Sequence, residues 1–329
     1  MKEEEIRPVN LMEENEVLHR QDVEELLKEK GSFVEVPCPS CDSRNYRPIF
    51  KKEDFSFVVC ADCETVFINP RPASETLINF YANSKSIKHW NDKIYPASEA
   101  VRRSNVFVPR AKRVIELCQK YGTKDDVIFD VGGGYGTFCE EIKNFNFFKK
   151  VVCVEPSRDL AETCRQKGIE VIEKPIEDIG MSGASVITNF ELIEHLFSPK
   201  DFILACHKAL SKDGLFFLTT PNIKGFDLVT LGASSDNIAG PNHINYFNCD
   251  SLGRLLESCG FKVEEVLTPG KLDAEIVRNK ILNGKFDVSN QPFLKNILLD
   301  NWEDLGLSFQ SFLAENKLSS HLWVVARKL

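Results

Sequence analysis

The stretch Val127-Ile-Phe-Asp-Val-Gly-Gly-Gly-Tyr-Gly-Thr-Phe138 decides the fold of this chain. Residues 127–131 are apolar and β-branched enough to form one buried strand, and residues 137–143 have the pattern of a helix. Between them stand Gly132, Gly134 and Gly136, spaced G-x-G-x-G. Glycine lets the backbone approach a ligand closely, and the free N–H groups that open a helix favour a negatively charged group. The stretch therefore predicts a strand–turn–helix unit that binds a ligand, with an unliganded tight turn as the alternative.

The chain beyond this stretch alternates strand patterns with helix patterns. Six further strands are predicted at residues 151–155, 169–173, 184–189, 214–220, 261–267 and 321–328, and the helices between and around them include 158–167, 199–210 and 251–258. Such alternation predicts an α/β fold, with a mostly parallel sheet of seven strands and helices on both faces. A ligand is then expected at the carboxyl ends of the strands.

The ligand of the glycine turn is the next question. A dinucleotide fingerprint requires glycine or alanine at its third site, and Thr137 occupies that site here. An NAD-dependent oxidoreductase is therefore the less favoured interpretation.

The spacing resembles motif I of the class I S-adenosylmethionine (SAM) dependent methyltransferases, D/E-x-G-x-G-x-G, with Asp130 in the acidic position. The resemblance implies a Rossmann-like fold and SAM as the cofactor, with the glycines admitting its methionine part. It implies that Glu155, which ends the next strand, takes the ribose hydroxyls. Other residues implied to contact SAM are Asn189 and Phe190 at the adenosine, and Glu177 or Asp178 at the adenine amino group.

Four cysteines near the N-terminus form two pairs. Cys38-Pro-Ser-Cys41 and Cys60-Ala-Asp-Cys63 are separated by 18 residues, a spacing typical of zinc sites. Four thiolates make a closed tetrahedral shell with no position open for water, so the predicted Zn²⁺ is structural. Residues 46–50 and 55–59 are predicted to be ribbon strands, and four reduced cysteines without metal are the alternative. The other seven cysteines stand in apolar contexts and are expected to be buried thiols.

The ribbon, the Asn69-Pro-Arg-Pro72 segment and the Phe80-Tyr81 pair come before motif I in this order. The combination resembles a group of class I methyltransferases with an N-terminal zinc ribbon, which often act on sugars in surface-polysaccharide or secondary-metabolite pathways. The resemblance implies a carbohydrate acceptor, and it implies that Tyr81 lies over the cofactor. A non-catalytic SAM-binding protein or a zinc-ribbon adaptor protein is the alternative to an enzyme.

Candidate catalytic residues follow the strands. Residues 223–242 are predicted to be a long loop, either an active-site lid or disordered, and they lead into Pro241-Asn-His-Ile-Asn-Tyr-Phe247. His243 and Tyr246 are expected to reach the acceptor, since a histidine titrates near neutral pH and is a natural general base. His195 is the second candidate for the base, and Tyr81 and Tyr246 are candidate catalytic partners. Histidines that only pack their loops are the alternative at both positions.

Composition limits the class of protein. The chain has 329 residues, 43% of them hydrophobic and 27% charged, with a formal net charge of −8. That balance is typical of a soluble protein and disfavours a nucleic-acid partner. Neither a signal peptide nor a membrane span is recognised, so a cytoplasmic location is expected. The predicted parts are an acidic extension (1–31), the zinc ribbon (32–70), connecting helices (71–125), the SAM-binding core (126–270 and 320–329) and a helical insertion (271–319). The insertion is expected either to cover the pocket or to pair protomers in a homodimer.

Overall fold

The computed structural model describes residues 2–329, which fold into two compact units. The first unit contains the residues up to Ser98 together with Pro221–Leu252 and Leu267–Leu322, and the second contains Glu99–Thr220, Gly253–Val266 and Trp323–Leu329. Residues 221–252 thus group with the N-terminal part of the chain. The division into five parts expected from the sequence stays a prediction.

The second unit is built on a seven-stranded sheet in the order β10-β11-β8-β7-β4-β5-β6. Its strands are β4 (Val127–Val131), β5 (Lys150–Val154), β6 (Glu170–Ile172), β7 (Ala184–Phe190), β8 (Leu210–Pro221), β10 (Phe261–Leu267) and β11 (His321–Lys328). β4 pairs in parallel with both β5 and β7, and β5–β6 and β7–β8 are also parallel. All seven predicted strands and the α/β class are confirmed.

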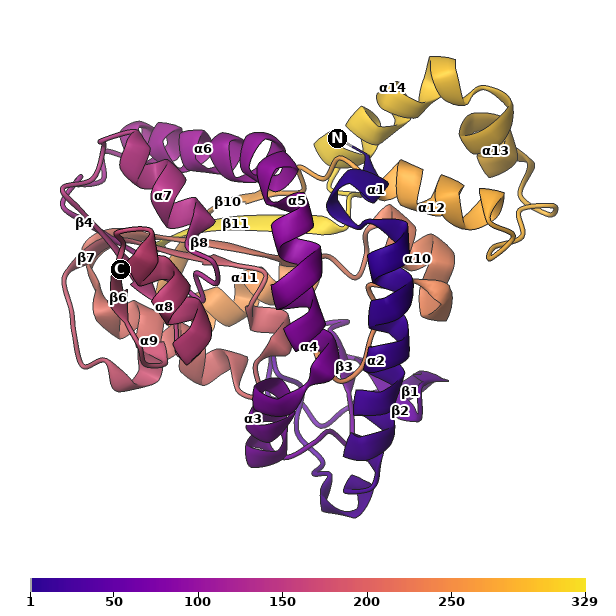
Figure 1. Ribbon diagram of the computed structural model, residues 1–329, viewed down its shortest axis with the longest axis horizontal. Coiled ribbons are helices and arrows are strands. Elements are labelled where there is room, and N and C mark those ends of the chain that lie inside the picture. The colour runs from indigo at the N-terminus through magenta and orange to yellow at the C-terminus, as the bar shows by residue number, and fades with distance from the viewer. Residues whose placement is uncertain (1) are drawn as a thin grey trace. The chain divides into compact units, whose positions relative to one another are not determined.

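Helices cover both faces of this sheet because each has one apolar side. Those of the second unit are α6 (Val108–Lys120), α7 (Thr137–Asn144), α8 (Arg158–Gln166), α9 (Pro199–Ala209) and most of α11 (Cys249–Ser258). Figure 1 shows α6 and α7 on one side of the strands and α9 on the other. In α9, Phe202, Ile203 and Cys206 are buried at helical spacing. The carboxyl ends of the parallel strands are left for the loops that carry the predicted cofactor residues.

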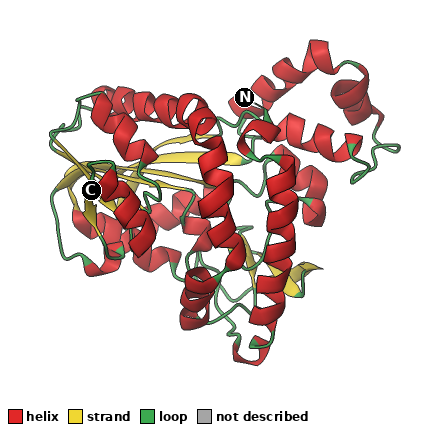
Figure 2. Ribbon diagram, in the orientation of Figure 1, coloured by secondary structure: helices red, strands yellow, loops and turns green. Residues whose placement is uncertain are grey.

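The first unit contains a small sheet in the order β1-β2-β3-β9, which Figure 2 colours as strands among helices. β1 (Tyr46–Lys52) and β2 (Phe55–Cys60) form an antiparallel hairpin, as predicted for the ribbon. Its two turn residues, Glu53 and Asp54, have φ of 50° and 63°, the left-handed values that a two-residue hairpin turn requires. β3 (Val66–Ile68) follows, and the fourth strand, β9 (Asn245–Tyr246), comes from a distant part of the sequence.

Helices make up the rest of the first unit. They are α1 (Glu3–Ile6), α2 (Val9–Leu27), α3 (Ser74–Asn83), α4 (Lys85–His89), α5 (Tyr95–Arg102, which runs on into the second unit), α10 (Phe226–Leu231), α12 (Asp273–Leu282), α13 (Pro292–Lys295) and α14 (Trp302–Glu315). No helix within residues 2–329 combines the length and apolar character that crossing a membrane requires.

The prediction of a structureless loop over residues 223–242 is wrong. The segment contains α10 and a 3-10 turn (Gly232–Ser234). Leu231 belongs to an apolar cluster with residues of α12 and α14, and Phe226 packs against it. These two residues form the apolar face of α10. The many glycine, serine and asparagine residues around them make this face hard to identify in the sequence.

Candidate active site residues

The glycine turn leaves β4 and enters α7 with left-handed backbone at three places. Gly132, Gly134 and Gly136 have φ of 71°, 54° and 69°, values that side chains rarely allow. A Cβ on Gly136 would lie 2.7 Å from Ile169 and 2.9 Å from Cys164, so this glycine serves close packing. At Gly134, by contrast, no heavy atom outside the neighbouring residues lies within 4 Å of such a Cβ in the described chain. Gly134 therefore borders open space, where a ligand would contact the backbone.

Glu155 follows β5 and holds this turn in place. Its Oε2 accepts a hydrogen bond from the Gly134 N–H at 3.0 Å, and its Oε1 accepts one from the Ser157 N–H at 2.9 Å. The residue is only 6% exposed, and burial raises the pKa of its carboxyl. The acid predicted to bind ribose is thus also a structural support of the cofactor turn.

Asp130 lies beneath the turn. Its carboxylate accepts hydrogen bonds from the Thr188 hydroxyl at 2.7 Å and the Cys139 thiol at 3.5 Å. Burial raises the pKa of Asp130 to about 6. These contacts tie β4 to β7 and α7, so the acidic residue of the motif stabilises the scaffold of the turn.

Asn189 and Phe190 end β7, beside β4. The Asn189 amide donates to the Val131 carbonyl at 3.0 Å, but its buried Oδ1 has no hydrogen-bond donor within residues 2–329. Buried polar atoms are almost always paired, so this oxygen fits a donor group on a ligand. The Phe190 ring already has the guanidinium of Arg110 at 4.2 Å from its centroid, and Phe138 packs edge-on against it. Arg110 was not recognised in the sequence, because its helix is distant from the strand motifs.

Glu177 and Asp178 lie in an exposed 3-10 turn (Ile176–Asp178) after β6. His195 lies in another such turn (Ile193–His195), with its Nε2 3.8 Å from Oε1 of Glu194. Glu194 is 1% exposed, accepts a hydrogen bond from the Thr220 hydroxyl, and has its pKa raised by burial. Sequence reasoning missed Glu194, although the acid stands directly before His195.

The remaining candidate catalytic residues lie in the first unit. The Tyr81 hydroxyl, on α3, donates to the carbonyl of Asn242 at 2.8 Å, next to His243. The rings of His243 and Tyr246 meet at 5.9 Å in an edge-on arrangement. Tyr246 is fully buried, and its hydroxyl accepts from the Ala239 N–H at 3.1 Å. The structure therefore brings Tyr81 of α3 to the segment that carries His243 and Tyr246.

A backbone contact determines which nitrogen of His243 carries the proton. Nδ1 lies 2.9 Å from the carbonyl oxygen of Asn237. A carbonyl oxygen only accepts, so Nδ1 must donate, and the neutral ring then has its basic lone pair on Nε2. This is the tautomer that lets Nε2 accept a proton.

The four predicted metal ligands converge. The sulfurs of Cys38, Cys41, Cys60 and Cys63 all lie within 4.8 Å of one another, with Cys38–Cys63 at 3.5 Å and Cys41–Cys60 at 3.6 Å. Tetrahedral zinc with bonds of about 2.3 Å places its sulfurs about 3.8 Å apart. The cluster therefore fits Zn²⁺ in number, type and spacing of ligands.

The ribbon contacts the segment that carries His243 and Tyr246. Val66 pairs with Tyr246 across β3 and β9, and the Asn248 amide donates to the Cys63 carbonyl at 3.0 Å. Ser40, between the first two cysteines, donates to the Ser251 carbonyl at 2.8 Å. The buried guanidinium of Arg71 donates to Asn245 Oδ1 at 3.1 Å.

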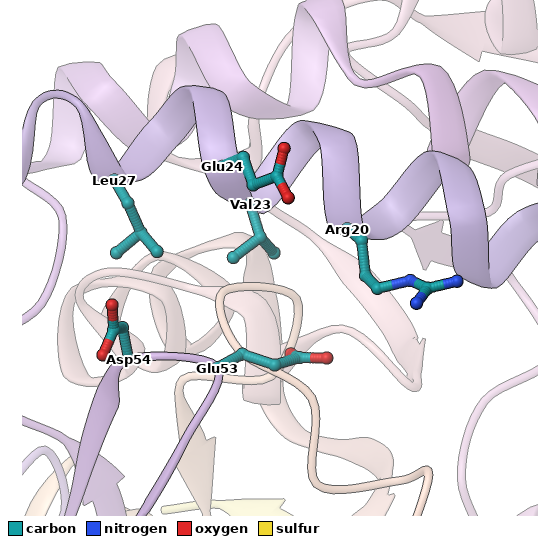
Figure 3. Close-up of a pocket in the computed structure, with 6 residues that line it drawn as sticks. All are labelled: Arg20, Val23, Glu24, Leu27, Glu53 and Asp54. Carbon is teal, nitrogen blue, oxygen red and sulfur yellow. The ribbon is translucent and has the colours of Figure 1, made fainter.

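A surface hollow of about 240 Å³ lies elsewhere in the first unit, between α2 and the β1–β2 turn (Figure 3). Its lining residues are Arg20, Val23, Glu24, Leu27, Glu53 and Asp54. Its lining includes no residue of the glycine turn and none of the segment that carries His243 and Tyr246. The hollow is therefore not part of the candidate site.

Comparison with known proteins agrees with this geometry. Residues 103–266 match a family model described as a methyltransferase domain. A probable S-adenosylmethionine-dependent methyltransferase of Mycolicibacterium smegmatis is 34% identical over 95 residues, which cover 29% of this chain and 34% of that protein. The C-methyltransferase NovU of Streptomyces niveus is 26% identical over 185 residues, covering 53% of this chain and 41% of that protein.

These matches span less than half the length of either curated relative. Among solved structures, the plantazolicin methyltransferase BpumL in complex with SAH has a TM-score of 0.50 at 13% identity, covering 77% of this chain and 94% of that one. This likeness concerns the fold. Taken with the strand order and the glycine turn, the matches show that residues 103–266 form a class I SAM-dependent methyltransferase domain.

Proposed function

We propose that the protein transfers a methyl group from SAM to a small-molecule acceptor, a sugar or a nucleotide-linked sugar. The observation that carries the proposal is the turn at Gly134, which borders open space and is held by Glu155. SAM would supply an electrophilic methyl group on a sulfonium. Asn189 Oδ1, which has no donor among residues 2–329, offers a hydrogen-bond acceptor to the same cofactor.

The chain's own contribution is alignment and proton removal. Methyl transfer is an in-line displacement, for which holding two reactants in register contributes about 7–11 kcal/mol. A hydroxyl acceptor must also lose a proton, and a general base contributes roughly 10²–10⁴-fold. We assign this step to Nε2 of His243, because the Asn237 carbonyl fixes the proton on Nδ1. His195 is the second candidate, and Tyr81 and Tyr246 orient the loop.

The zinc ribbon is proposed as the scaffold of the catalytic segment. Zinc bound by Cys38, Cys41, Cys60 and Cys63 would fix the two knuckles, and the knuckles hold residues 245–251 through the strand pair and hydrogen bonds described above. Because all four ligands are cysteines, no position remains for water, and the role is structural.

The acceptor class rests on the resemblance of the N-terminal part and on the names of two relatives. NovU is a C-methyltransferase, and a relative from a Caulobacter strain is an O-methyltransferase of ubiquinone biosynthesis, 28% identical over 117 residues. The two names cover a carbon and an oxygen acceptor, and the second concerns a small molecule, so carbon and oxygen acceptors deserve equal testing. The net charge of −8 favours such an acceptor over nucleic acid.

Calorimetric titration with SAM, S-adenosylhomocysteine and NADH tests the cofactor. We expect SAM and S-adenosylhomocysteine to bind and NADH not to bind. Binding of NADH without binding of SAM would indicate an oxidoreductase. If neither cofactor binds, the result would indicate an adaptor protein. Mass spectrometry of nucleotide-sugars incubated with the protein and SAM then tests the acceptor, with a gain of one methyl group as the expected result.

A further inference from the structure

Within the first unit, Asn237 connects the N-terminal segment, α10 and the segment that carries His243 and Tyr246. Its carbonyl oxygen accepts hydrogen bonds from Nδ1 of His243 at 2.9 Å and from the Tyr246 hydroxyl at 3.3 Å. Its side-chain Oδ1 accepts from Nη2 of Arg7 at 3.0 Å, and its Nδ2 donates to Oδ2 of Asp227 at 3.4 Å. One residue thus bonds two of the candidate catalytic side chains, His243 and Tyr246, and two charged groups.

The two charged groups fix the orientation of the Asn237 amide. A guanidinium can only donate and a carboxylate can only accept, so Oδ1 must face Arg7 and Nδ2 must face Asp227. With both ends of the side chain held, the backbone of residue 237 has little freedom to rotate. Its carbonyl therefore stays directed at His243.

Arg7 is itself held in place by the N-terminal segment. It forms an ion pair with Glu3 at 3.6 Å, one helical turn earlier. Glu3 is fixed to α12, because its N–H donates to Glu275 at 3.1 Å and its carboxylate accepts from Asn279 at 2.9 Å. Residues 3–7 thus form a bridge from α12 to Asn237.

We propose that residues 3–7 act as a clamp, in which Arg7 is a positioning residue that, through Asn237, keeps His243 in its Nδ1-protonated tautomer. The clamp gives the N-terminal segment a part in methyl transfer although it does not contact the reactants. The inference rests on the proposed role of His243 as the base. Its structural part, the control of the tautomer, stands on the hydrogen bonds alone.

The experiment compares Arg7→Met, Arg7→Lys and Asn279→Ala in the full-length protein. Asn279→Ala loosens Glu3 from α12 and leaves the Arg7–Asn237 bond in place, so it tests the far end of the clamp. Nitrogen-15 chemical shifts of labelled histidine report the tautomer, with the His243 signal among six histidines assigned by its loss in His243→Ala. Turnover is measured against pH with the methyl acceptor, and SAM affinity by calorimetry.

For Arg7→Met we expect a mixture of His243 tautomers, turnover lowered roughly tenfold, less than the loss of a general base, and unchanged SAM affinity. Arg7→Lys should keep the wild-type tautomer, and Asn279→Ala should change it in the same direction as Arg7→Met but less. A wild-type tautomer and pH profile in Arg7→Met overturns the clamp, as does a greater loss in Asn279→Ala than in Arg7→Met. If no acceptor is methylated, the proposed function fails, but the tautomer signals still decide the clamp.

Discussion

Asp227 in α10 offers a sharp test of the electrostatics of the first unit. Its side chain is fully buried, and Asp273, also buried, is the nearby like charge that affects it. Asp273 is well supplied with donors, since the Ser319 hydroxyl bonds both its oxygens and Gln310 donates at 2.8 Å. Asp227 therefore lies beside a second buried carboxylate that is held by several hydrogen bonds.

Burial and Asp273 raise the pKa of Asp227 from 3.8 to about 6. Between these two pH values the folded chain holds a proton that the unfolded chain has released. The free energy of unfolding therefore falls as the pH rises through this window and is constant above it. One pKa unit corresponds to about 1.4 kcal/mol, so this group makes the fold about 2 kcal/mol less stable at pH 7.5 than at pH 4.

Asp227→Asn removes the charge and keeps the shape, and its amide oxygen can still accept from Asn237. We expect urea titrations at pH 7.5 to show a free energy of unfolding roughly 1–3 kcal/mol above that of the wild type, with the difference vanishing near pH 4. Asp300→Asn, at an exposed position, is the control and should show no such dependence. A variant no more stable than the wild type at pH 7.5 would refute the reasoning, because the fold would then stabilise the charged carboxylate.

Other predictions test the cofactor turn, the base and the metal. Glu155→Ala should weaken SAM binding by about 1–3 kcal/mol in calorimetry, since it unpairs two backbone N–H groups and the ribose, and Glu155→Gln should lose less. Gly134→Ala should abolish SAM binding while the circular dichroism spectrum is kept; unchanged affinity would show that the open space is not the cofactor site. His243→Ala should leave SAM affinity intact and lower turnover roughly 10²-fold or more, so unchanged turnover would exclude it as the base. Removing zinc with a strong chelator should speed hydrogen exchange over residues 244–251 without weakening SAM binding. If protein purified without metal shows slow hydrogen exchange over the same residues, the proposed scaffold role of the zinc is wrong.

The sheet of the second unit was predictable because its strands are short apolar runs between helices of ordinary length. Each predicted strand matches an observed one to within a few residues, and the greatest difference is the extension of β8 back to Leu210. α10 was missed because its apolar residues stand among glycine, serine and asparagine. The apolar face they form can be identified only in the folded chain, where residues of α12 and α14 pack against it.

The candidate site was predictable where its residues follow strand ends in local motifs. Glu155 and Asn189 were found in this way, and their contacts with Gly134 and Val131 follow from the pairing of neighbouring parallel strands. Arg110 and Asn237 were not found. Their contacts join segments far apart in the sequence, and no local pattern distinguishes them from other polar residues.

The pairing of β3 with β9 in the first unit was not predicted for the same reason, because it joins segments far apart in the sequence. A two-residue strand has no stability of its own, so the register of β9 depends on its partner. That register is fixed by the Val66–Tyr246 pair, by the Ile68 N–H bonding the Ile244 carbonyl, and by the Arg71–Asn245 bond. A cysteine cluster with no position for substrate can therefore still matter for catalysis, because the strand it holds carries Tyr246 and follows His243.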